Sequence, residues 1–158
     1  HPLDYLRWLL GDISALWTFS GQVAELEIEV EAVAEIGLHF ANGVLGTVHL
    51  DYIQRPPAHR LEIVGTQGTI YWDYIAGSLR VYRSTSDEWQ SHSLPDGFER
   101  NDLFLEQMRH FLAVSHGSEK PRCTLDDGIW AQELACAAHD AARLGTMQTW
   151  NNGINSRG

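Results

Sequence analysis

The sequence predicts an α+β fold, built from an open, predominantly antiparallel β-sheet of about six strands with helices covering one face. Between about residues 15 and 94, apolar and polar residues alternate with a period of two, which is typical of half-buried strands. The connections there are of hairpin length, which favours antiparallel pairing. Helical periodicity occupies the first ten residues and returns only after about residue 101.

The chain begins with a predicted short helix that ends before Gly11. Leu3, Leu6 and Leu10 recur near helical spacing. Pro2 stands in the first turn, where a missing backbone N–H costs a helix nothing.

A hairpin with one polar face follows. Apolar residues of the segment 32–40 alternate with Glu35 and His39, and Asn42-Gly43 is a strong turn signal because both residues tolerate positive φ. The next strand, at about 45–53, ends at "RPP" because proline cannot donate to a strand ladder. Its polar side carries Thr47, His49 and Asp51.

The segments "HRLEIVGTQGTIYWDY", "SLRVYRS" and "EWQSHSL" supply the remaining strands. Two helices close the pattern, at about 101–115 and 125–144, and each carries an apolar stripe expected to cover the sheet. Thr124 and Asp127 approximate a capping box before the second of these helices. We expect one domain over residues 1–146 and an irregular tail at 147–158.

Composition excludes several classes of partner. Eleven basic residues against twenty-one acidic ones give a formal net charge of −10, which disfavours nucleic acid. No segment approaches the roughly 20 apolar residues of a membrane span, and the start lacks the features of a signal peptide. Cys123 and Cys136 fall outside any CxxC spacing and are expected to be reduced thiols. These observations favour a cytoplasmic protein without nucleic-acid or membrane partners.

Common motifs for cofactors and metals do not occur in the sequence. It contains no GxGxxG, GxxxxGK[ST] or GxSxG, and the "GTQG" of residues 65–68 is predicted to be a turn between strands. There are eight histidines, but no HxH or HExxH pair, so we expect no metal site.

His1 and Asp4 are three residues apart and therefore share one face of the predicted helix. Both side chains would then look into a single cleft. The alternative is a terminal histidine without a role and an aspartate that only favours the positive end of the helix. Spacing alone leaves both interpretations open.

Four segments together resemble a known family. They are "HPLDYLRWLLGD", "LHFANGVLGTVHLDY", "LEIVGTQGTIYWD" and "TLDDGIWAQELACAAHDAA". In this order they are similar to the C-terminal domain of the Gfo/Idh/MocA family of NAD(P)-dependent oxidoreductases. The resemblance implies a fold like the C-terminal domain of glyceraldehyde-3-phosphate dehydrogenase, preceded in the full-length protein by a Rossmann domain that this chain lacks.

The resemblance also implies roles for individual residues. His1 falls on the histidine of the family's Asp-x-x-x-His motif, whose aspartate and partner lysine would lie upstream of this sequence. Histidine suits a base that takes the proton of a hydroxyl as hydride leaves the carbon. The substrate would be a sugar, a polyol or a sugar derivative, contacted by Asp4, Arg55 and His59. NAD or NADP would bind the full-length protein, and the fragment would bind none and be inactive alone.

Two further expectations concern partners. The polar sheet face is expected to pair with a second copy, which predicts at least a homodimer. A non-catalytic relative of the same fold, which senses a ligand or binds a protein, is the alternative function, because fold alone does not determine activity.

Overall fold

The computed structural model describes residues 1–150 of the 158-residue chain. The described residues divide into two compact units. Residues 1–53 and 122–150 form the first unit, and residues 54–121 form the second unit.

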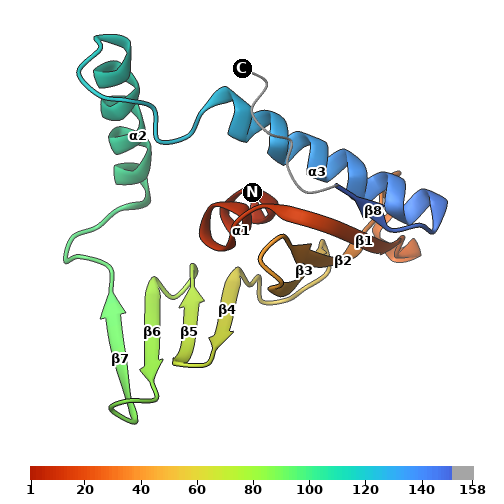
Figure 1. Cartoon of the computed structure of the whole chain (residues 1–158), viewed down its shortest axis with the longest axis horizontal. Coiled ribbons are helices and arrows are strands. Elements are labelled where there is room, and N and C mark those ends of the chain that lie inside the picture. The colour runs from red at the N-terminus through yellow and green to blue at the C-terminus, as the bar shows by residue number, and fades with distance from the viewer. Residues whose placement is uncertain (151–158) are drawn as a thin grey trace. The chain divides into compact units, whose positions relative to one another are not determined.

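The first unit contains a four-stranded antiparallel sheet, the first sheet, with strand order β3-β2-β1-β8. Helix α3 packs against β1, and α1 packs against α3 (Figure 1). The elements in chain order are α1 (Pro2–Leu10), β1 (Ile13–Gly21), the 3-10 helix η1 (Ala24–Leu26), β2 (Val33–Phe40), β3 (Leu45–Asp51), α3 (Leu125–Leu144) and β8 (Gln148–Thr149).

The core of the first unit lies between the first sheet and its helices. Phe40, Leu16 and Leu134 are the largest side chains that are almost completely covered, with exposed fractions of 0%, 1% and 0%. Ile36 and Leu38 are also buried, so the predicted inward side of β2 is confirmed. The outer side of β2 and β3 carries Glu35 and His49, as the alternation requires.

Local sequence signals explain where the helices begin and end. Pro2 lies in the first turn of α1, and Gly11 follows that helix with φ of +97°, a conformation that glycine adopts without strain. Thr124 and Asp127 form the predicted capping box of α3. Gly145 ends α3 in the left-handed conformation, so the predicted bounds 125–144 are confirmed.

The second unit contains a second antiparallel sheet of four strands in the order β4-β5-β6-β7. The α+β class and the antiparallel pairing are therefore confirmed, but the strands divide between two sheets where one of about six was expected. Pro56 and Pro57 precede the second sheet, and neither has an N–H to donate to a ladder. The elements are β4 (Arg60–Gly65), β5 (Gly68–Asp73), β6 (Ser78–Arg83), β7 (Glu88–Ser93) and α2 (Arg100–Ser115).

Helix α2 departs from the expectation that it covers a sheet. None of the residues of α2, all of which the structure describes, is buried. The members of its apolar stripe are exposed, with 56% for Phe104, 56% for Met108 and 62% for Phe111. A stripe at helical spacing identifies an apolar face but carries no information about what covers it.

The predicted irregular tail at 147–158 is wrong for its first residues. Gln148 and Thr149 form β8 and pair with Leu16 and Ala15 of β1. A two-residue strand is too short for an alternation pattern to reveal. Residues 151–158 of that tail lie outside the described residues. Within residues 1–150, no helix is both long enough and apolar enough to span a membrane.

Candidate functional site

His1 and Asp4 lie at the beginning of α1. His1 is the N-cap residue, and its carbonyl accepts a hydrogen bond of 3.1 Å from the backbone N–H of Tyr5. The His1 side chain is exposed and makes no capping bond, while Asp4 occupies the first helical turn. The two residues therefore share one helical face, as their spacing predicts.

A hollow of about 320 Å³ opens beside this face of α1. All of its lining belongs to the first unit. Helix α1 contributes four residues, the segment before α3 contributes two, and the first turn of α3 contributes one. They are Asp4, Tyr5, Arg7, Trp8, Arg122, Cys123 and Asp127.

Arg7 links α1 to α3 at this hollow. Its Nη1 donates to Oδ1 of Asp127 at 3.0 Å, and its Nε donates to Oδ1 of Asp12 at 2.9 Å. Its guanidinium also lies 5.3 Å from the ring centre of Trp130, within cation–π range. The charge of Arg7 is thus already matched inside the protein.

The capping box makes Asp127 a firm anchor. Hydrogen bonds from the backbone N–H and the side chain of Thr124, followed by that from Arg7, hold the pKa of the Asp127 carboxyl below its usual value. Asp127 therefore stays ionised and paired with Arg7 across the pH range in which enzymes work.

Cys123 in the same hollow is a protonated thiol. Burial, together with the negative charges of Asp4 and Asp127, raises the pKa of the Cys123 thiol above its ordinary value. A thiol in this state is a poor nucleophile, because the thiolate is the reactive form. Cys123 is therefore a poor candidate for a covalent catalyst.

The other two predicted substrate residues belong to the second unit, so the structure groups only His1 with Asp4. Arg55 Nη1 donates to the backbone carbonyl of Gln54 at 2.8 Å. The His59 ring lies 5.1 Å from that of Trp72 and 5.3 Å from that of Tyr74, which makes it part of an aromatic cluster. Their predicted roles stay predictions.

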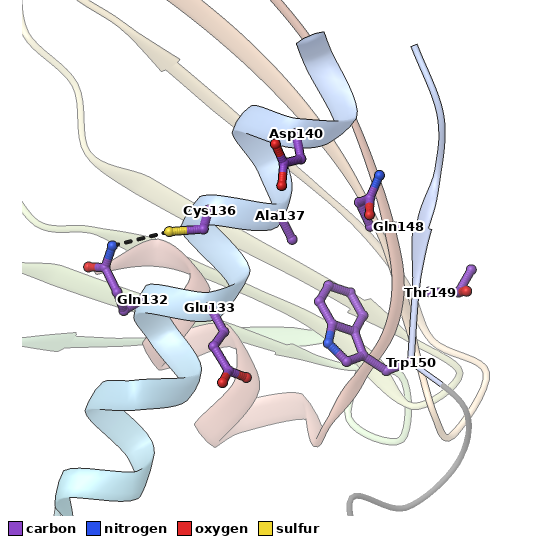
Figure 2. Close-up of a pocket in the computed structure, with 8 residues that line it drawn as sticks. All are labelled: Gln132, Glu133, Cys136, Ala137, Asp140, Gln148, Thr149 and Trp150. Carbon is purple, nitrogen blue, oxygen red and sulfur yellow. Dashed lines mark hydrogen bonds between the residues drawn. The ribbon is translucent and has the colours of Figure 1, made fainter. Parts of the chain in front are cut away.

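A second hollow, of about 370 Å³, lies between α3 and β8. Figure 2 shows Glu133, Cys136 and Asp140 on α3 on one side and Trp150 on the other, with Gln132 Nε2 donating to the Cys136 sulfur at 3.4 Å. It contains none of the predicted site residues. The hollow beside α1 is therefore the better candidate.

The glycine-rich turn Gly65–Gly68 joins β4 to β5, whereas phosphate cradles precede a helix. A Cβ at Gly68 would lie 2.0 Å from the carbonyl oxygen of Tyr82, so that glycine serves close strand packing. Within residues 1–150, no group of three or more His, Cys, Asp or Glu is placed to hold a metal ion.

A family model matches the first part of the chain. Residues 1–71 match the family model of the GFO/IDH/MocA C-terminal domain. No curated protein matches the sequence.

Solved structures with a similar fold match nearly the whole chain. An oxidoreductase from Agrobacterium radiobacter in complex with NAD+, L-tartaric acid and magnesium is 25% identical, with a TM-score of 0.75 over 94% of this chain and 46% of that chain. The WlbA dehydrogenase from Bordetella pertussis, in complex with NADH and UDP-GlcNAcA, is 21% identical, with a TM-score of 0.72 over 97% of this chain and 43% of that chain. An NAD binding oxidoreductase from Klebsiella pneumoniae is 16% identical, with a TM-score of 0.84 over 97% and 49%. The chain thus spans a little under half the length of these structures, and the last two show the fold alone.

Sequence reasoning missed most of the residues that line the hollow beside α1. Tyr5 and Trp8 continue the helical spacing of His1 and Asp4, so that spacing was a usable signal. Arg122 and Cys123 come from a distant part of the chain, and no local pattern connects them to α1.

Proposed function

We propose that this chain is the substrate-binding and oligomerisation domain of an NAD(P)-dependent oxidoreductase that acts on a sugar, a polyol or a sugar derivative by hydride transfer. The observation that carries the proposal is the placement of His1 and Asp4 on one face of α1, where Asp4 lines a hollow large enough for part of a small molecule. The match to the GFO/IDH/MocA C-terminal domain supports it.

In this proposal His1 is the general base. Its imidazole takes the proton of the reacting hydroxyl, so that the carbonyl forms as hydride departs. Asp4, one turn along α1, accepts a hydrogen bond from a neighbouring hydroxyl and orients the substrate. Arg55 and His59 are also proposed to contact substrate.

The nucleotide is assigned to a second domain. NAD or NADP, held by a Rossmann domain outside this chain, supplies the hydride acceptor. The matched structures are about twice as long as this chain, which leaves room for such a domain. In this proposal the chain alone binds no nucleotide and is inactive, and the full-length protein works in the cytoplasm.

Nucleotide reduction by the full-length protein tests this function. We expect NADH or NADPH to form with at least one member of a panel of sugars, polyols and sugar acids. We expect none from the 158-residue chain assayed alone. Absence of nucleotide reduction with the whole panel, despite nucleotide binding by the full-length protein, would favour a ligand-sensing relative and contradict the proposed activity.

The outer face of the first sheet is proposed to contact a second copy. It exposes apolar side chains beside the Glu35–His49 pair, with exposed fractions of 42% for Trp17, 71% for Phe19 and 74% for Leu45. Such a patch is typical of an interface between subunits. Light scattering should give at least a dimer, and Phe19→Glu should shift it toward monomer, whereas an unchanged monomer at high concentration contradicts the assignment.

A further inference from the structure

We propose that Trp8 is a substrate-contacting residue. Its indole stacks against the ring of one sugar unit, while Asp4 accepts hydrogen bonds from the hydroxyls of that sugar. The proposal rests on the proposed function and names a further binding residue of the same site. It also narrows the substrate class to molecules with a closed, hydroxylated ring.

The geometry of α1 places Trp8 in line with the proposed base. His1, Asp4, Tyr5 and Trp8 are separated by three, four and seven residues and therefore share one helical face. The opposite face carries Leu3 and Leu6, which are buried in the core with exposed fractions of 8% and 6%. Helix α1 thus divides into a core face and a site face.

Trp8 is the most exposed large side chain on that site face. Its exposed fraction is 79%, and it lines the hollow together with Asp4 and Tyr5. Two helical turns correspond to about 10 Å along the axis. Because helical side chains lean toward the N-terminus, the indole leans toward Asp4 and shortens the distance to His1.

The polar groups of the hollow narrow the ligand chemistry. Arg7 and Asp127 neutralise each other, and the Cys123 thiol is protonated, so these three residues add no net charge for a ligand. Asp4 contributes an acceptor, Arg122 contributes donors, and Trp8 contributes a flat apolar surface. A sugar ring matches this set, because it presents an apolar face of C–H groups and a rim of hydroxyls.

An open-chain polyol lacks the flat C–H face and provides a direct comparison. D-glucose and sorbitol carry similar hydroxyls, but only D-glucose closes into a ring. NMR titrations of the 158-residue chain with each compound measure binding without any nucleotide. We expect D-glucose to bind more tightly than sorbitol.

Substitution of Trp8 provides the decisive contrast. Trp8→Ala should weaken D-glucose binding about fivefold, the size expected for loss of one aromatic contact, and Trp8→Phe should retain part of it. Leu9→Ala is the matched control, because Leu9 is the exposed neighbour on the same helix but does not line the hollow. Trp8→Gln repeats the test with a helix-compatible polar side chain, and circular dichroism verifies the fold of each variant.

Two results would overturn the proposal. One is unchanged D-glucose binding in folded Trp8→Ala and Trp8→Gln, and the other is no binding of D-glucose by the wild-type chain. The titrations require neither cofactor nor turnover. They therefore test the role of Trp8 separately from the proposed activity, which failure of nucleotide reduction in the full-length protein would refute.

Discussion

The indole of Trp17 on β1 lies directly over Gly37 on β2. The two residues are cross-strand partners, and a Cβ at position 37 would lie 2.5 Å from Nε1 of Trp17. Only a residue without a side chain leaves room for this ring. The same indole contacts Phe19 edge-on at 4.5 Å between ring centres, so Gly37 sets the position of an aromatic pair on the outer face.

Gly37→Ala should therefore destabilise the domain by about 1–3 kcal/mol, the usual cost of overpacking. Gly21→Ala is the matched control, because a Cβ there meets nothing within 4 Å. Urea denaturation gives both free energies of unfolding. Equal stability of the two variants would contradict the close approach of Trp17.

Leu134 anchors α3 to the core. Its exposed fraction is 0%, whereas Leu125 on the same helix is 81% exposed. Leu134→Ala should cost about 2–5 kcal/mol, and Leu125→Ala should change the free energy of unfolding by less than about 0.5 kcal/mol. Similar effects at both positions would mean that α3 packs through a different face.

Local signals in the sequence predicted the helices well. Thr124 with Asp127, and Gly11 after α1, are chemical signals that act within one turn of the chain. The turn at Asn42-Gly43 is equally local, and Gly43 has φ of +87°. Such features depend on neighbouring residues, so they can be read without knowledge of the fold.

Partnerships between distant residues were harder to predict. The division into two sheets depends on which strands pair, and alternation within a strand does not specify its neighbours. Arg122 meets α1 only after the chain has folded. The aromatic contacts of His59 with Trp72 and Tyr74 likewise join residues that are separated in the sequence.

Protonation of His49 should be visible in the pH dependence of stability. Its Nδ1 lies 2.5 Å from Oε1 of Glu35, and its Nε2 lies 2.9 Å from Oδ2 of Asp51. Hydrogen bonds to Glu35 and then to Asp51 raise the pKa of His49 above its ordinary value. The stabilisation is therefore fully present below about pH 6.5, the unfolded value, and is lost as the pH rises through the raised folded pKa.

NMR titration of the His49 ring measures this effect. Glu35→Gln should move the pKa of His49 back toward its ordinary value, because it removes the largest cause of the shift. His49→Gln should remove this contribution to the pH dependence of unfolding. A His49 pKa at or below the ordinary value in the wild-type chain would contradict the pairing.

Asp127 should affect the stability of the protein at acidic pH, in contrast to His49. Its lowered pKa means that its stabilisation is present above about pH 4, the unfolded value, and is lost as the pH falls through the lower folded pKa. Asp127→Asn should reduce the loss of unfolding free energy on acidification, measured by denaturation at a series of pH values below about pH 4. Asp126→Asn, one residue earlier in α3, is the control and should leave this loss in place.

The turnover of a His1 variant in the full-length enzyme tests the central claim most directly. His1→Ala should lower kcat by about 10²- to 10⁴-fold, the usual contribution of a general base. His116→Ala, at the exposed C-cap of α2, should leave kcat unchanged. Near-normal turnover of His1→Ala on a substrate that the wild-type enzyme oxidises would contradict the account.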